Sequence, residues 1–181
     1  MAVQTAGNHL DQLIRQTRAH HVALSAAADF KANMLLTLSA VVIPLTIRFL
    51  DTEKLRYAAI VLIGACAVTA ALAAYSAMPK ILNDKNPAPK SGPNFNPLFF
   101  GDFARLNYEE FTKQLEDAMQ SPAAAYEVQL REIYTMGMYL ANRKYKYLKL
   151  AYMSMIAGII LSVFIWLGTE GLSILGVLKF Q

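Results

Sequence analysis

The sequence predicts an all-α integral membrane protein with three transmembrane helices, the first and third of which extend into a cytoplasmic helical module. Two observations lead to this fold class. Hydrophobic residues make up 55% of the 181 residues and charged residues only 17%, a composition richer in apolar residues than is usual for globular domains. The apolar residues are also concentrated in three stretches, at 34–47, 57–78 and 150–166.

The three apolar stretches reach the length of a membrane span in different ways. A spanning helix needs about 20 apolar residues, and residues 57–78 provide 22 without a charge. The third span is expected at 148–167, because the aliphatic stem of Lys149 can lie along the apolar core while its charge reaches water. The first is long enough if it covers 32–50. Pro44 predicts a kink there, which membrane helices tolerate.

The distribution of positive charge predicts the orientation of the chain. Of the 17 Lys and Arg residues, 13 lie within residues 1–33 and 79–149 and four lie elsewhere. Because positive flanks stay in the cytoplasm, we expect the N-terminal helix at 1–31 and the loop and helical segment at 79–149 to be cytoplasmic. Residues 168–181 would then form a short outer tail.

The N-terminal segment favours a helix, whereas the long middle loop excludes a regular one. Asn8 can cap a helix, and no Gly or Pro occurs from there to residue 43, which predicts one continuous helix that enters the membrane. Residues 79–101 contain five prolines, and this spacing excludes a regular helix.

Two further helix starts are predicted after this loop. Asn107 and Glu110 have the spacing of a capping box. Ser121 followed by Pro122 is typical of an N-cap and a first helical residue. No proline follows, so the second of these helices is expected to continue without interruption to residue 166.

Small residues recur at four-residue spacing in the second and third spans. Small side chains at this spacing let helices approach closely in lipid. Two alternatives are open: packing between spans of one chain, or association of several copies into a homo-oligomer. The helix-packing candidates are Cys66, Ala70 and Ala74 in one span and Ser154, Gly158 and Ser162 in the other.

The sequence offers no set of residues for catalysis or metal binding. Of the three histidines, His20 and His21 are adjacent and therefore point to different faces of a helix. A single cysteine, Cys66, excludes a disulfide or a cysteine-based metal site within one chain. We therefore expect a protein that is not an enzyme, with no metal and no bound cofactor.

Charged residues gather where the first and third spans leave the membrane. Asp29 and Lys31 precede the first span, and a basic run at 142–149 precedes the third. An acid at the membrane rim is costly unless it is paired, so a salt bridge from Asp29 to Arg143 or Lys146 is expected, with Lys31 in the same ion-pair group.

The basic run has two alternative interpretations. It can be an anchor that touches anionic headgroups, or it can be an anion site in which cations hold a phosphate and an aromatic ring stacks on a base. The candidate ligand-binding residues are Arg105, Arg143, Lys144, Tyr145 and Lys146.

Three motifs in order suggest a family. Residues 29–33, the pair of segments 99–101 and 108–111, and residues 143–148 resemble the transmembrane effectors of the bacterial Pycsar antiphage system, over roughly residues 8–168. The resemblance implies an inner-membrane protein that senses cyclic CMP or cyclic UMP, made by a companion cyclase, and impairs the membrane so that growth stops.

The alternative function is a non-enzymatic membrane scaffold or a small channel with no nucleotide ligand. A nucleic-acid partner is not expected, because the net charge is only +4 and a nucleic-acid binder carries a dense basic face.

Overall fold

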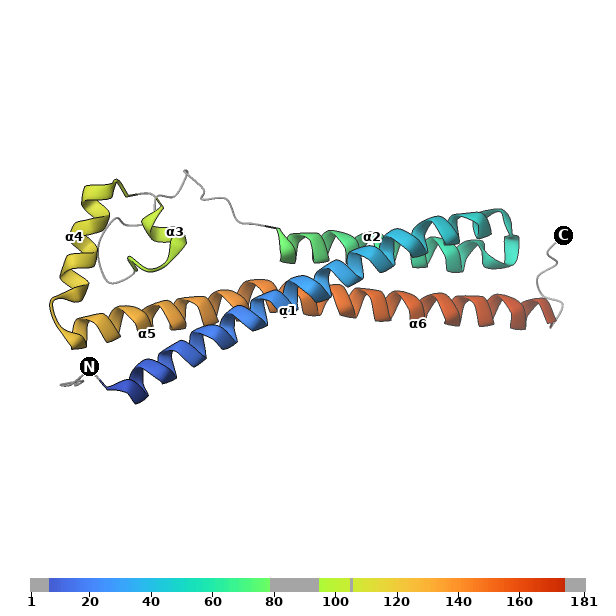
Figure 1. Ribbon diagram of the computed structural model, residues 1–181. Helices are drawn as coiled ribbons and strands as arrows, with labels where there is room; N and C mark the ends of the chain where they lie inside the picture. The colour runs from blue at the N-terminus through green and yellow to red at the C-terminus, as the bar shows by residue number, and fades with distance from the viewer. Residues whose placement is uncertain (1–6, 79–94, 105, 175–181) are drawn as a thin grey trace. The chain divides into compact units, whose positions relative to one another are not determined.

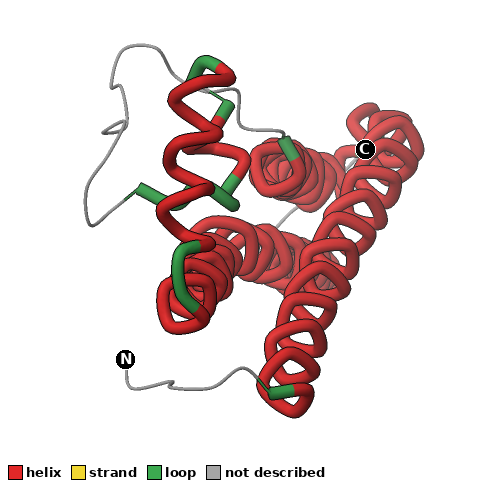
Figure 2. The backbone as a smooth tube through the Cα atoms, turned by 60° about the vertical axis from the view of Figure 1, so that its left-hand side comes forward, coloured by secondary structure: helices red, strands yellow, loops and turns green. Residues whose placement is uncertain are grey.

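The computed structural model describes residues 7–78, 95–104 and 106–174, and every regular element among them is a helix (Figures 1 and 2). Three helical segments are long and apolar enough to cross a membrane, Asn8–Asp51, Glu53–Ala77 and Pro122–Leu172. The predicted fold class, an all-α integral membrane protein, is therefore confirmed.

The chain divides into two compact units. The first unit contains Met1–Ser25 and Pro79–Leu140, and the second, here called the membrane unit, contains Ala26–Met78 and Ala141–Gln181. The elements in chain order are α1 (Asn8–Ile47), the 3₁₀ turn η1 (Arg48–Asp51), α2 (Glu53–Ala77), α3 (Phe100–Phe103), α4 (Tyr108–Met119), α5 (Pro122–Tyr139), the π-helical segment η2 (Leu140–Tyr145) and α6 (Lys146–Ile174).

The third long helix differs from its prediction. We expected it to run without interruption to residue 166, whereas six residues of η2 separate α5 from α6. A π-helix hydrogen-bonds from i to i+5 and is therefore wider than an α-helix. A π-helical segment requires no Gly or Pro, so no residue pattern in this sequence predicts η2. The α6 helix also continues beyond the predicted span, to Ile174.

The membrane unit is built around small buried side chains. In this unit α2 and α6 lie side by side and α1 crosses them obliquely (Figure 1). Around the centre of the unit, one series of buried positions on each helix alternates three and four residues apart, which is the spacing of coiled-coil seams. They are Ala28, Ala32, Leu35 and Ser39 on α1, Cys66, Thr69, Ala73 and Ser76 on α2, and Leu148, Ala151 and Met155 on α6.

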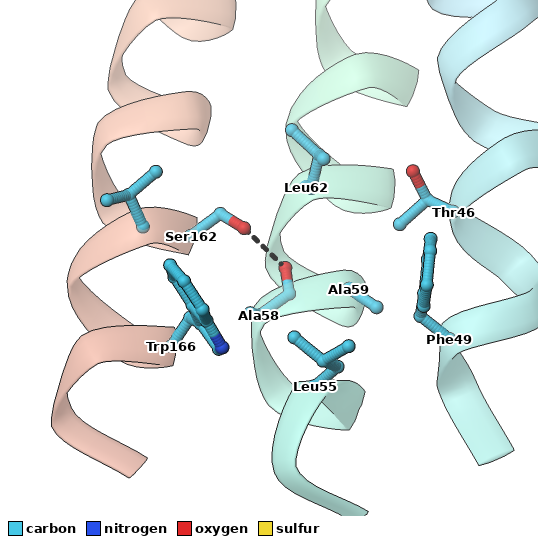
Figure 3. Close-up of a pocket in the computed structure, with 9 residues that line it drawn as sticks. Thr46, Phe49, Leu55, Ala58, Ala59, Leu62, Ser162 and Trp166 are labelled. Atoms are coloured by element: carbon cyan, nitrogen blue, oxygen red, sulfur yellow. Dashed lines mark hydrogen bonds between the residues drawn. The ribbon is translucent and has the colours of Figure 1, made fainter. Parts of the chain in front are cut away.

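Hydroxyl groups fasten α2 to α6 along their whole length. Each donates a hydrogen bond to a backbone carbonyl across the interface, and we call this set the hydroxyl ladder. The acceptor of Ser76 lies in η2, directly before α6, and Thr169 also donates to the carbonyl of Trp166 in its own helix at 2.8 Å. In lipid such bonds contribute about 0.6–2 kcal/mol each. The bonds are Ser76 to Lys144 at 2.9 Å, Thr69 to Ala151 at 3.4 Å, Ser154 to Ala65 at 3.4 Å, Ser162 to Ala58 at 3.0 Å (Figure 3) and Thr169 to Lys54 at 3.1 Å.

The small-residue face of α6 is occupied by α2 of the same chain. A Cβ added at Gly158 would clash with the Cβ of Ala65, so the two helices are tightly packed there. Ser154 and Ser162 flank Gly158 and both belong to the hydroxyl ladder. Within one chain, this face is therefore packed against α2.

The three small residues predicted on α2 do not share one environment. Cys66 is fully buried, with its sulfur 4.0 Å from that of Met155 on α6. Ala70 is half-buried and Ala74 is exposed. Cys66 therefore packs inside the chain, whereas Ala74 faces away from it.

The first unit is organised around Asn96, whose side chain is 1% exposed. Its Nδ2 donates to the carbonyl of Val128 at 3.3 Å, and its Oδ1 accepts from the backbone N–H of Leu98 at 2.9 Å. Arg131 donates to the carbonyl of Phe95 at 3.4 Å. These bonds hold the segment that begins at residue 95 against α5.

The predicted helix starts in the first unit are confirmed. Asn107 and Glu110 form a complete capping box at the start of α4, and Ser121 caps α5 with Pro122 in its first turn.

Candidate functional site

One ion pair joins two helices at the end of the membrane unit that carries Asp29, here called the Asp29 end. The Nζ of Lys144 lies 2.7 Å from both carboxylate oxygens of Asp29. The Lys144 side chain is only 12% exposed and that of Asp29 is 41% exposed. The carbonyl of Lys144 also accepts the hydroxyl of Ser76. Lys144 therefore connects α1, α2 and η2 at one point.

The predicted partner of Asp29 is wrong by one residue. We expected Arg143 or Lys146, on the assumption of a regular α-helix through this segment. The π-helical turn of η2 is wider, and it directs Lys144 toward α1 instead. Lys31 was predicted to belong to this pair, but it is exposed and forms no ion pair with any residue that the structure describes.

The candidate ligand residues separate into an inward and an outward set. Lys144 is held by Asp29, and Tyr145 is half-buried against the apolar core. Arg143 and Lys146 are exposed and have no ion-pair partner within the described ranges. Arg105 lies outside the described residues. The outward pair is thus the part of the predicted set that an anion can reach directly.

An aromatic pair near this end was not predicted. The rings of Tyr75 on α2 and Tyr147 on α6 meet edge to face, with centroids 4.5 Å apart. Tyrosines near the ends of two apolar spans are typical of the aromatic belt at a membrane surface. That enrichment is the signal that could have identified them.

Charge is distributed unequally between the two ends of the membrane unit. Five cations, Lys31, Arg143, Lys144, Lys146 and Lys149, face a single carboxylate at the Asp29 end, which gives a net charge of +4. At the opposite end, three cations are balanced by three acids among the residues that the structure describes. These are Arg48, Lys54 and Arg56 with Asp51, Glu53 and Glu170.

The pocket at the opposite end is lined mainly by apolar side chains. It encloses about 260 Å³ and is flanked by the rings of Phe49 and Trp166 (Figure 3). The hydroxyl of Thr46 donates to the carbonyl of Val42 at 2.7 Å, and that of Ser162 belongs to the hydroxyl ladder. Both hydroxyls of the lining are therefore used within the protein, and the indole N–H of Trp166 is the remaining polar side-chain group among the lining residues.

A second pocket lies in the first unit, and its lining includes a carboxylate, which disfavours the binding of an anion. Its volume is about 350 Å³, and its lining includes Asp11, Gln129 and Tyr126. The Tyr126 hydroxyl donates to the Asp11 carboxylate at 2.7 Å, and this bond raises the pKa of Tyr126 above its usual value. A phosphate here would face the carboxylate of Asp11.

These observations define the class of the protein: an all-α membrane protein with three helices able to span a bilayer and a cationic end. Among the described residues, no group of metal-ligating side chains occurs. The chain matches the family model of the Pycsar effector protein domain over residues 12–169. It therefore belongs to the Pycsar effector family, whose members are transmembrane effectors of antiphage defence. The family predicted from the three motifs is thus confirmed.

No curated protein matches the chain significantly. No solved structure matches it significantly either.

Proposed function

We propose that this protein senses a cyclic pyrimidine nucleotide, cyclic CMP or cyclic UMP, in the bacterial cytoplasm and responds by impairing the inner membrane, which causes growth arrest or cell death. Membership of the Pycsar effector family supports the defence role. The observation that carries the sensing step is the excess of cations at the Asp29 end. Such an excess is typical of a cytoplasmic membrane face.

The mechanism begins with competition for Lys144. A cyclic nucleotide carries a phosphodiester anion, which the exposed Arg143 and Lys146 attract. Once bound beside them, this anion competes with Asp29 for the ammonium group 2.7 Å away. A ligand shifts such an equilibrium only by its difference in affinity for the two states. The nucleotide therefore favours the state in which the ion pair is open.

Opening this pair would act mainly on α1. The hydroxyl ladder holds α2 and α6 together whether or not the ion pair is intact. On α1, by contrast, the Thr46 hydroxyl bonds within its own helix, and the buried Ser39 hydroxyl has no partner in the part of the chain that the structure describes. Detachment of α1 from a fixed α2–α6 pair is the membrane-impairing step of the proposal.

Two predicted ligand residues enter this mechanism indirectly. Tyr145 packs against the core, so it can stack on a base only after it turns outward, as loosening of α1 would allow. Arg105 stays a proposed phosphate contact. Homo-oligomerisation is also part of the proposal, with Ala70 and Ala74 as the small-residue surface open to a second copy, because Ala74 is exposed.

Calorimetric titration of the detergent-purified full chain tests the sensing step. The ligands are cyclic CMP, UMP, AMP and GMP. We expect selective binding of a pyrimidine nucleotide, and its loss in the variant Arg143→Gln/Lys146→Gln. The variant Arg48→Gln/Arg56→Gln removes the same charge at the opposite end and should bind normally. Absence of binding to a folded protein would contradict the proposal and favour a scaffold or channel without a nucleotide ligand.

A further inference from the structure

A groove between α1 and α6 opens sideways from the membrane unit. Its volume is about 620 Å³, and α1 lines it with Phe30, Met34, Leu38 and Val41. Tyr152 contributes the α6 side. The α1 side chains are exposed, with Phe30 at 67% and Met34 at 55%. The groove is thus mainly apolar, with Asn33 and Thr37 as its polar lining residues, and no part of the described chain covers it.

The length of the groove matches one leaflet of a bilayer. From Phe30 to Val41 an α-helix rises about 16 Å at 1.5 Å per residue, and half of a hydrocarbon core is about 15 Å. A helix of a second copy would cross both leaflets, whereas an acyl chain occupies one. The dimensions therefore favour a lipid chain as the occupant.

Two lysines lie close in sequence to residues that line the Asp29 end of this groove, although neither lines it directly. Lys31 follows Phe30 directly, and Lys149 lies one helical turn before Tyr152, a spacing that places side chains near one another. Both lysines are exposed, and neither forms an ion pair within the described part of the chain. Basic pockets between membrane helices bind anionic headgroups.

We propose that this groove binds one anionic phospholipid, with an acyl chain along Met34 and Leu38 and its phosphate between Lys31 and Lys149. The lipid touches both α1 and α6, so it helps to hold α1 in the packed position. This site does not depend on nucleotide sensing. The outward cations Arg143 and Lys146, to which the nucleotide is assigned, are not part of it.

The test compares phosphatidylglycerol with phosphatidylcholine on the detergent-purified full chain, with lipid retention measured by native mass spectrometry. We expect preferential retention of phosphatidylglycerol. Each lysine near the surface contributes about fivefold in affinity, so Lys31→Gln/Lys149→Gln should weaken retention about 30-fold. The variant Arg143→Gln/Lys146→Gln removes equal charge from the same end and should retain the lipid within about twofold. Equal loss in both variants would mean unspecific charge attraction and would overturn the proposal.

A second variant tests the apolar part of the site. Leu38→Trp fills the groove and should reduce phosphatidylglycerol retention while all cations remain. Glycerol phosphate, the headgroup without its chains, should raise the thermal stability far less than the whole lipid, and equal stabilisation would contradict the site. Light scattering identifies the competing occupant: if Leu38→Trp dissociates a dimer and leaves lipid retention unchanged, the groove binds a second copy. The comparison of the two lipids on the unmodified chain needs no variant, and equal retention of both would overturn the proposal by itself.

Discussion

Replacing Asp29 by Asn removes the counter-ion of Lys144 and leaves an ammonium group whose side chain is only 12% exposed. Leaving a fully buried charge unpaired costs about 3–5 kcal/mol, whereas an exposed ion pair contributes at most about 1 kcal/mol. Asp29 itself is 41% exposed, so water replaces part of the lost interaction. We therefore expect Asp29→Asn to destabilise the packed state by about 2 kcal/mol, or roughly 30-fold in its equilibrium.

A double-mutant cycle measures this coupling. The free energy of unfolding in detergent is compared for the unmodified chain, Asp29→Asn, Lys144→Met and the double variant, and the expected interaction is about 1–2 kcal/mol. The chain supplies a matched control in the pair of Lys54 and Glu170, which are 3.3 Å apart with side chains 40% and 34% exposed. Glu170→Gln should cost less than about 1 kcal/mol.

The same variant has an expected effect on the membrane. If the ion pair holds α1 against α2 and α6, Asp29→Asn should release dye from vesicles in the absence of any nucleotide, and Glu170→Gln should not. A cost of Asp29→Asn no greater than that of Glu170→Gln would refute the reasoning, because the near-burial of Lys144 would then have no energetic consequence.

Three further predictions concern other contacts. Gly158→Ala should lower the stability in thermal unfolding by about 2–3 kcal/mol, because the added Cβ meets a side chain of α2, whereas Gly64→Ala, with nothing within 4 Å, should be tolerated. Arg18→Gln should lower the free energy of unfolding, measured by chemical denaturation, by about 2 kcal/mol, because it leaves the carboxylate of Glu132, which is only 9% exposed, without its partner. The substitution Arg15→Gln, at an exposed position, should change it little. Tyr126→Phe should lower the free energy of unfolding by about 1 kcal/mol at pH 8. Because the pKa of Tyr126 is raised, this difference from the unmodified chain should vanish as the pH rises through that pKa. A difference in stability that persists at higher pH would contradict the assignment.

Patterns local in sequence predicted much of the fold. The apolar stretches, the capping box at Asn107 and the cap at Ser121 each depend on residues within a few positions of one another, so a single sequence contains all the information they need. The family likewise followed from the order of three short motifs.

Contacts between distant segments were predicted less well. Asp29 was correctly expected to need a cation, but the choice of Lys144 depends on the π-helical turn, where Ser76 bonds to a carbonyl 68 residues away. The hydroxyl ladder was missed for a related reason. A serine such as Ser162 in an apolar span can bond within its own helix or across to another, and only the neighbouring helix decides which.

The hydroxyl ladder has a consequence for biogenesis. Its donors and acceptors are separated by 68 residues in the bond from Ser76 and by 115 in that from Thr169. At about 5–20 residues per second, these positions leave the ribosome roughly 3–23 s apart. During that interval α1 and α2 must reside in the bilayer while the hydroxyls of Thr69 and Ser76 lack their final acceptors and can bond only within their own helix. Final assembly of the membrane unit must therefore wait until α6 has been synthesised, and a polypeptide released before that point would lack these acceptors.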